Sequence, residues 1–336
     1  MKLLLRADAS AVIGAGHIAR VVAYAERAVA RGWDVSFAGA TDNAEWLASR
    51  FDALSVPVLP VSDWASLASG FDAVLVDHYA LGDVRAEVNA AGALLVSLED
   101  DTFGRRPADV VVDAGFAPSP RPSDGSGVLL RGVEYTALRS GVLAARARRS
   151  ADASPSPHVA VVLGGGAEWS GTVSLLLRAL AATRLPFSAD ALVRGEPALP
   201  DLSDDQSIRV AAPHPGLLDL LATTDVAISA TGVTFLELCC LGIPTAAVQL
   251  VDNQAPGYRA AVDLGLAVGL GDAGSLSDRL PAVVSALGSL LSDAGLRSSL
   301  SSAAASSVDG LGADRVLDVI ASSQGGFDGF LSRFRH

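Results

Sequence analysis

Cysteine, lysine and long apolar runs are all scarce in this sequence, and each shortage argues against a class of protein. The two cysteines, Cys239 and Cys240, are adjacent, and two such residues make neither a disulfide framework nor a zinc cluster. Lysine occurs only at Lys2, and the formal net charge is −12, which argues against the basic contacts that nucleic-acid binding needs. No uninterrupted apolar run approaches the ~20 residues that span a bilayer.

These shortages set our expectations for partners and location. The apolar start of the chain is too short for a signal peptide, so we expect a cytoplasmic protein without membrane insertion. We expect no nucleic-acid partner and no cofactor, and we interpret the acidic run 99–101 as a polar strand end rather than a metal site. With a single lysine, an anionic ligand is best held by helix N-termini and glycine loops. The sequence leaves the oligomeric state open, and a monomer is our expectation.

Length and composition indicate two domains. A chain of 336 residues can bury two separate cores. Residues 146–158 are rich in serine, proline and alanine and break the periodic pattern, as an inter-domain linker does. We therefore predict an N-terminal domain over 1–150 and a C-terminal domain over 151–336, with the last helix a candidate to pack back on the first domain. The alternative is that residues 146–158 form a long surface loop within one domain.

Strands and helices alternate through the first half of the sequence. Apolar runs predict strands at residues 2–5, 33–39, 71–80, 93–101 and 109–115. Alternation of this kind is typical of a parallel, doubly wound sheet. The third run ends in Asp77, His78 and Tyr79, and polar residues at strand ends lie where such sheets bind ligands. We interpret His78 as a structural hydrogen-bonding residue rather than a catalyst.

A glycine turn within residues 6–20 joins the first strand to an alanine-rich helix. Gly14 and Gly16 allow positive φ and the close approach of a ligand. A helix that begins at such a turn attracts anions through its free N–H groups and its dipole. His17 stands at the mouth of the turn, where its imidazole can handle a proton. Taken alone, the pattern leaves open that His17 merely packs at the start of the helix.

The second half repeats the order of strand, glycine turn and helix. Strands are predicted at residues 159–163, 226–229 and 245–250. The first of them is followed by the glycines 164–166, and the second by the turn 230–232 and a short helix over 233–241. Gly242 closes that helix. The polar residues 252–254 follow the third strand, at the expected ligand-binding edge of the sheet.

Together these motifs resemble a known family. The segments RADASAVIGAGHIAR, VDHYAL, SLEDD, LGGG, SATGVTFLELCCLG and DNQ occur in the order seen in the UDP-sugar hydrolases of pseudaminic acid biosynthesis. Those enzymes release UDP and the free sugar from a UDP-activated diacetamido-trideoxy sugar. The likeness covers about residues 2–265, and a more distant one is to the lipid-linked N-acetylglucosaminyltransferase of peptidoglycan synthesis. It implies an α/β fold of the GT-B type, with two Rossmann-like, doubly wound parallel-sheet domains facing a cleft.

The resemblance assigns roles in catalysis and in UDP binding. His17 matches the family's catalytic histidine, which activates water for attack at the anomeric carbon. An imidazole with its ordinary pKa of ~6.5 suits a general base at neutral pH. Gly232, Val233 and Thr234 match the turn that holds the diphosphate, and Glu237 matches the acid that accepts hydrogen bonds from the ribose hydroxyls.

Further substrate contacts follow from the same resemblance. Asn253 and Gln254 match amides that face the sugar, and Tyr79 matches an aromatic residue near it. The remaining substrate contacts are assigned to Arg6, Asp8, Gly14, Gly16, Gly164 and Gly165. The chain departs from the family where Ala167 and Glu168 stand in place of the usual Thr-Asp, so the role of Glu168 is open.

These inferences predict an enzyme that hydrolyses a UDP-activated diacetamido-trideoxy sugar in nonulosonic (pseudaminic) acid biosynthesis. One alternative is a GT-B glycosyltransferase that uses a UDP-sugar donor, and another is a non-catalytic nucleotide-sugar binding subunit. A transferase with a lipid acceptor should carry a basic amphipathic helix in the first domain. Residues 39–61 and 101–124 show none, which favours the hydrolase. The sequence does not identify the sugar.

Overall fold

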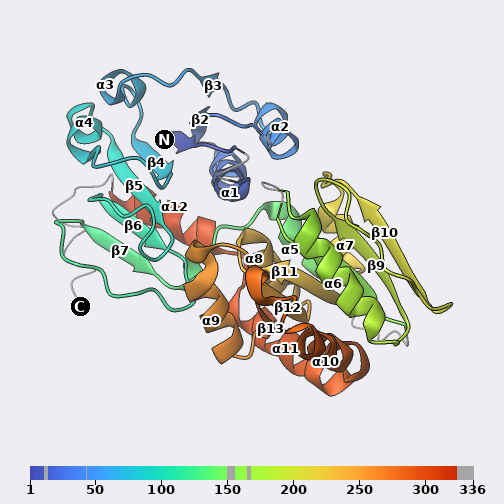
Figure 1. Ribbon diagram of the computed structural model, residues 1–336. Coiled ribbons are helices and arrows are strands. Elements are labelled where there is room, and N and C mark those ends of the chain that lie inside the picture. Colours follow the sequence, from blue (N-terminus) through green and yellow to red (C-terminus); the bar gives the residue numbers. More distant parts are fainter. Residues whose placement is uncertain (11–13, 43, 150–155, 165–167, 324–336) are drawn as a thin grey trace. The chain divides into compact units, whose positions relative to one another are not determined.

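The structure, a computed structural model, describes residues 1–10, 14–42, 44–149, 156–164 and 168–323 (Figure 1). Residues 150–155 of the predicted linker 146–158 lie outside these ranges. The chain forms two compact units, one of Met1–Ser140 with the chain from Gly310 onward, the other of Gly141–Asp309. It therefore passes between the units twice, and the first unit ends at Ser140 where the sequence suggested 150. In the ranges given, no helix is both long and apolar enough to cross a membrane.

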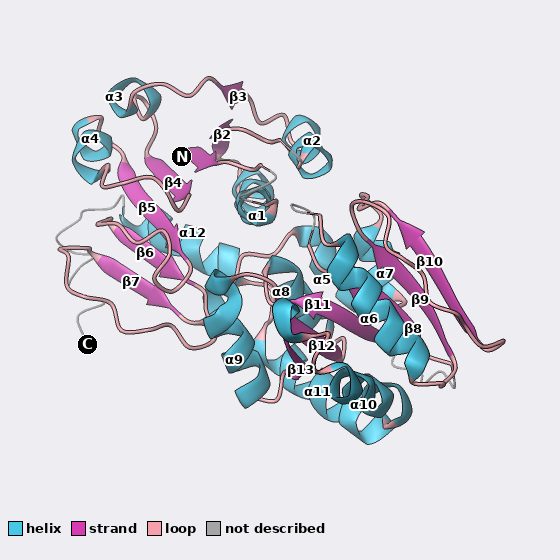
Figure 2. Cartoon of the chain, in the orientation of Figure 1, coloured by secondary structure: helices cyan, strands magenta, loops and turns pink. Residues whose placement is uncertain are grey.

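The first unit is built on a seven-stranded parallel sheet in the order β3-β2-β1-β4-β5-β6-β7 (Figure 2). Its strands are β1 (Lys2–Ala7), β2 (Asp34–Ala38), β3 (Val58–Leu59), β4 (Ala73–Asp77), β5 (Leu94–Glu99), β6 (Val110–Asp113) and β7 (Val128–Arg131). Every residue of β4 is buried, as expected of a strand covered on both faces. The strand order reverses between β1 and β4, so their carboxyl ends form the topological switch point of this unit.

The helices of this unit are α1 (Gly16–Ala30), α2 (Glu45–Ala53), α3 (Trp64–Leu67), α4 (Arg85–Ala90) and α12 (Gly312–Ser323), with the 3-10 turn η1 (Val133–Tyr135). Helix α12 packs against α1 and η1 and buries Val316, Leu317 and Ile320. Arg31 at the end of α1 donates hydrogen bonds to Asp314 and Asp318 of α12. Buried apolar side chains and ion pairs thus hold α12 against the first unit.

The second unit has a six-stranded parallel sheet in the order β10-β9-β8-β11-β12-β13. Its strands are β8 (His158–Val162), β9 (Phe187–Leu192), β10 (Gln206–Ala211), β11 (Val226–Ala230), β12 (Thr245–Gln249) and β13 (Ala267–Asp272). Its helices are α5 (Ser140–Arg148), which begins at the division, α6 (Ser170–Ala182), α7 (Leu217–Ala222), α8 (Val233–Leu241), α9 (Ala255–Asp263), α10 (Leu280–Ser292) and α11 (Ala294–Ser307), with the 3-10 turns η2 (Asp252–Gln254) and η3 (Ala273–Ser275). Its order reverses between β8 and β11. The predicted fold class, two α/β halves with parallel sheets, is confirmed.

The main core of the second unit lies between one sheet face and helices α6 and α10. It contains Val159, Val161, Ala189 and Ala191 from β8 and β9, packed with apolar residues of both helices. Helix α8 has the bounds that the sequence predicted. Gly242 ends it in the left-handed region at φ 64°, a conformation that glycine adopts without strain.

Replacing Gly39 by alanine is expected to destabilise the first unit strongly. Gly39 has φ 154°, and a Cβ atom there would stand 1.7 Å from the backbone oxygen of Ala7, so the end of β1 must move. We expect a loss of about 3 kcal/mol in the free energy of unfolding. Gly125→Ala is the matched control, because Gly125 also has positive φ (80°) but nothing lies within 4 Å of its added Cβ. Thermal unfolding of the two variants measures the difference, and equal losses contradict the steric argument.

Candidate active site in the first unit and ligand edge of the second

A buried pair of His17 and Asp77 forms at the switch point of the first sheet. His17 lies in the first turn of α1, and Asp77 is the last residue of β4. Their side chains are 4% and 1% exposed, and His17 Nδ1 lies 2.5 Å from Asp77 Oδ1. The carboxylate accepts the hydrogen bond, so Nδ1 carries the proton. Nε2 of the same ring is then left with its lone pair.

Arg20 keeps Asp77 ionised. It follows His17 by one helical turn, and its Nε and Nη2 each donate to one oxygen of Asp77 at 2.7 Å. Such a two-pronged contact is the strong form of an arginine–carboxylate pair. Burial alone would raise the pKa of Asp77, but the charge of Arg20 and the hydrogen bonds from Arg20 and His17 hold that pKa well below its usual range. Asp77 is therefore a carboxylate at neutral pH.

Tyr79 and Asp100 extend this network from the ends of β4 and β5. Arg20 Nη1 donates to Asp100 Oδ1 at 2.5 Å, and the Tyr79 hydroxyl donates to the other oxygen of Asp100. The Tyr79 ring stands edge-on to the His17 ring, with 4.5 Å between the ring centres and 81° between the planes. Burial and the charge of Asp100 raise the pKa of the Tyr79 phenol, so it stays protonated. Tyr79 thus packs on His17, and its expected contact with a sugar remains a prediction.

Arg6, Asp8 and His78 form a second cluster at the same edge. Arg6 donates twice to the Asp8 carboxylate, at 2.5 and 2.8 Å. Burial alone would raise the pKa of Asp8, but the Arg6 contact and a backbone hydrogen bond lower it to about 2. His78 Nδ1 accepts from the backbone N–H groups of Ala80 and Leu81, so Nε2 carries the proton and donates to Asp8 at 2.9 Å. These hydrogen bonds fit the structural role expected of His78, which stays a prediction. Arg6 and Asp8 bind each other, and their proposed contacts with substrate stay untested.

The glycines of the first motif shape the turn before α1. Gly14 has φ 82° and donates a backbone hydrogen bond to Ser10 at 2.8 Å. Gly16 is the first residue of α1, directly before His17. Positive φ at Gly14 is the conformation for which the sequence motif selects glycine. Residues 11–13 of the motif lie outside the described part of the chain.

The predicted UDP and sugar contacts of the second unit follow three neighbouring strands. Gly164 comes after β8, Gly232 after β11, and Asn253 with Gln254 after β12. Because β8, β11 and β12 are adjacent and parallel, these residues share one edge of the sheet. Gly164 adopts φ 106°, while Gly165 lies outside the described residues.

The start of α8 is the centre of this edge. Gly232 is its N-cap, Val233 and Thr234 form its first turn, and Glu237 lies one turn further along with a buried side chain. The first N–H groups of a helix lack partners within the helix and attract anions. A Cβ at Gly232 would lie 3.8 Å from Gln254 Nε2, so the amide of Gln254 stands beside this turn.

The side-chain oxygens of Gln254 and Asn253, which follow β12, differ in their hydrogen bonding. Gln254 Oε1 accepts from the backbone N–H of Leu250 at 2.9 Å, which fixes its orientation. Asn253 Oδ1 is buried and accepts no hydrogen bond from the described residues. Buried acceptors of this kind usually have a partner, and a ligand hydroxyl or N–H is one that fits.

Sequence reasoning missed the partners of His17. Asp77 was noticed only as a polar strand end, and Arg20 was given no role. The spacing of His17 and Arg20 places them on one helix face, and doubly wound topology brings β4 beside β1, so both signals were present. Among the described residues, no group of three or more His, Cys, Asp or Glu side chains is arranged to hold a metal ion.

Comparison with solved structures identifies the architecture. MurG of Acinetobacter baumannii is similar over 96% of this chain and 99% of its own, with 17% identity and a TM-score of 0.65. The spinosyn forosaminyltransferase SpnP has the same coverage and identity and a TM-score of 0.63. The chain has the GT-B fold. A putative UDP-N-acetylglucosamine 2-epimerase of Listeria monocytogenes shares it at 12% identity, with 96% of each chain covered and a TM-score of 0.61.

Comparisons of the sequence with known families and proteins gave no match. No protein-family model matches the chain, and a search of curated proteins found no match. The GT-B fold confirms the coarse part of the resemblance seen in the sequence, while the likeness to pseudaminic acid hydrolases rests on its motifs alone.

Proposed function

We propose that this protein is a glycosyltransferase that moves a sugar from a UDP-sugar to an acceptor hydroxyl. The observation that carries the proposal is the buried His17–Asp77 pair at the switch point of the first sheet. An imidazole that a carboxylate fixes through one ring nitrogen acts as a general base through the other. MurG and SpnP, both similar in fold, support transfer as the reaction.

We assign the UDP-sugar to the second unit. The N–H groups of Gly232, Val233 and Thr234 at the start of α8 suit a diphosphate, because the helix N-terminus carries partial positive charge. Glu237 is one turn away and is assigned to the ribose hydroxyls, since a carboxylate accepts from both members of a diol. The unpaired acceptor of Asn253 is assigned to a hydroxyl or acetamido N–H of the sugar.

In the proposed reaction the acceptor hydroxyl gives its proton to His17 Nε2. The hydroxyl oxygen forms a bond to the anomeric carbon as the bond from that carbon to the diphosphate oxygen breaks. UDP leaves with the electron pair of that bond. The N–H groups at the start of α8 stabilise the charge that develops on the diphosphate, so no strong protein acid is needed.

Hydrolysis of a UDP-activated diacetamido-trideoxy sugar is the second candidate. It is favoured by the order of the motifs along the sequence, and water would replace the acceptor hydroxyl at the same base. We place transfer first because the similar structures named above are glycosyltransferases and an epimerase. A purely binding role leaves the His17–Asp77 pair without a purpose.

One assay separates these readings. The purified chain is incubated with a panel of UDP-sugars, with and without a mixture of acceptor alcohols, and released UDP is measured. Release that requires an acceptor supports transfer, whereas release in water alone supports hydrolysis. Binding of UDP without any release under either condition contradicts both and leaves the binding role.

Changing Glu237 to glutamine is expected to weaken UDP binding. The loss of hydrogen bonds from the ribose diol to a charged group should cost about 1.5–3 kcal/mol. Asp278→Asn, the same chemical change at an exposed position of the second unit, is the control and should leave the affinity unchanged. Titration calorimetry with UDP measures both variants. Wild-type affinity in Glu237→Gln removes this residue from the UDP site.

A further inference from the structure

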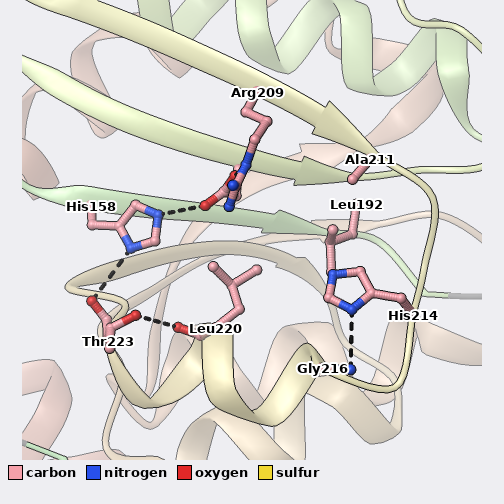
Figure 3. Close-up of a pocket in the computed structure, with 9 residues that line it drawn as sticks. His158, Leu192, Arg209, Ala211, His214, Gly216, Leu220 and Thr223 are labelled. Atoms are coloured by element: carbon pink, nitrogen blue, oxygen red, sulfur yellow. Dashed lines mark hydrogen bonds and ion pairs between the residues drawn. The ribbon is translucent and has the colours of Figure 1, made fainter.

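The second unit has a cavity on the sheet face opposite the α6 and α10 core. Its volume is about 480 Å³, within the range of small-molecule sites. Side chains alternate along a strand, so Ala189 and Ala191 of β9 enter the core while Asp190 and Leu192 line the cavity. The cavity runs from His158 at the start of β8 to His214 beyond the end of β10, and the six-residue helix α7 forms its far wall (Figure 3).

The carboxylate in this cavity is already occupied. Asp190 accepts from His158 Nε2 at 2.8 Å and from Arg209 Nε, one bond to each of its oxygens. Its side chain is only 10% exposed, and burial alone would raise its pKa, but the hydrogen bonds from Arg209 and His158 lower it. Asp190 is therefore a carboxylate whose two oxygens are both taken, one by His158 and one by Arg209.

The polar groups that remain available are donors. Neither terminal nitrogen of Arg209 bonds to any described residue, and the side chain is 75% exposed. His214 Nδ1 accepts from the Gly216 N–H at 3.1 Å, so Nε2 carries a proton that it can donate. In Figure 3, Leu220 and Leu192 lie between the two imidazoles and offer an apolar wall. These donors and the apolar wall match a ligand that carries an anionic group on an apolar part.

We propose that this cavity binds a small organic anion, a carboxylate or a phosphomonoester with an apolar body, through Arg209 and His214. Two of the five histidines of the chain line it, and a guanidinium with free N–H groups binds either anion in a two-pronged geometry. The site is centred on the sheet face at β8 to β10, apart from Gly232 and Thr234 after β11, and its His214 end lies beyond the carboxyl end of β10. It does not depend on the proposed transferase activity.

Histidine side-chain NMR of the full chain tests for binding. Phenyl phosphate and benzoate are the two anionic probes, and benzyl alcohol is the neutral control. Both anions are expected to shift the His158 and His214 signals in a saturable manner and to leave the His17 and His78 signals unchanged. The anion that binds more tightly shows whether the natural ligand is a phosphomonoester or a carboxylate. Signals are assigned with single His→Gln variants. Equal shifts from benzyl alcohol, or no saturable shift from either anion, overturn the proposal.

Two variants with opposite expected effects test the geometry. Arg209→Gln should weaken phenyl phosphate by about tenfold or more, the usual effect of losing a charged hydrogen bond. Asp190→Asn should tighten it, because the competing carboxylate no longer holds Arg209. Arg178→Gln, on exposed α6 surface packed on the other sheet face, should change nothing. Unchanged affinity in Arg209→Gln, weaker binding in a folded Asp190→Asn, or displacement of the probe by saturating UDP each contradicts a separate anion site.

Discussion

His17→Asn should lower kcat by about 10²–10⁴-fold, the usual effect of removing a general base. Asparagine is close in size to part of the imidazole and can still donate to Asp77, but it has no basic nitrogen where Nε2 stood. The affinity for UDP should hardly change, because we assign UDP to the other unit. Steady-state kinetics with the best UDP-sugar from the panel, and calorimetry with UDP, measure the two quantities.

The pH dependence of the wild type adds a second readout. The pKa of Asp77 is held well below its usual range, so Asp77 stays ionised down through mildly acidic pH. A fall in kcat/KM on mild acidification therefore does not come from protonation of this carboxylate. That acid limb should be missing from the residual activity of His17→Asn.

His78→Gln is the matched control for this experiment. His78 is the other histidine at this edge, and it holds Asp8 and two backbone N–H groups in place. Its replacement should lower the thermal stability while changing kcat by less than about tenfold. Full activity of His17→Asn makes His17 a packing residue and removes the general base from the proposed mechanism. An equal loss of kcat in His78→Gln shows that the effect is not specific to His17.

Much of the two sheets could be predicted because many of their strands are apolar runs. Strands such as β4, buried at every residue, leave a continuous apolar run in the sequence, and parallel strands in α/β folds are of this kind. The same runs are followed by polar residues, and this pattern alone predicts that Asp77, Asn253 and Gln254 lie at ligand-facing edges. Counted from the first strand of each unit, both sheets have an order that begins 3-2-1-4-5-6, which is one of the common orders of doubly wound sheets.

The partners within the candidate site were not predicted, because the helix spacing and the sheet topology indicate neighbours without fixing which side chains touch. His17 and Asp77 are 60 positions apart, and their contact depends on the register of β4 with β1, which places Asp77 beside Ala7. Arg20 resembles any surface arginine of a helix until Asp77 and Asp100 are placed on either side of it. The sequence made the return of α12 to the first unit only one option, since an amphipathic helix does not reveal which surface covers its apolar face.

Asp77→Asn should lower kcat about as far as the loss of His17, by roughly 10²–10⁴-fold. The carboxylate accepts a hydrogen bond from Nδ1–H and so keeps the lone pair on Nε2. An asparagine amide can instead donate to Nδ1, which moves the ring proton to Nε2 and removes the base without removing the imidazole. Arg20, which now binds both Asp77 oxygens, favours the amide oxygen for itself and turns the amide N–H groups towards His17.

Asp100→Asn tests whether this effect is specific to the Asp77 position. Asp100 also pairs with Arg20 and loses the same charge on substitution, but its second partner is the Tyr79 hydroxyl and not His17. Its kcat should fall by less than about tenfold. NMR of the His17 ring should show a change of tautomer in Asp77→Asn and none in Asp100→Asn. If the two variants lose activity equally, the Arg20 network acts only as scaffolding, and Asp77 has no special part in activating His17.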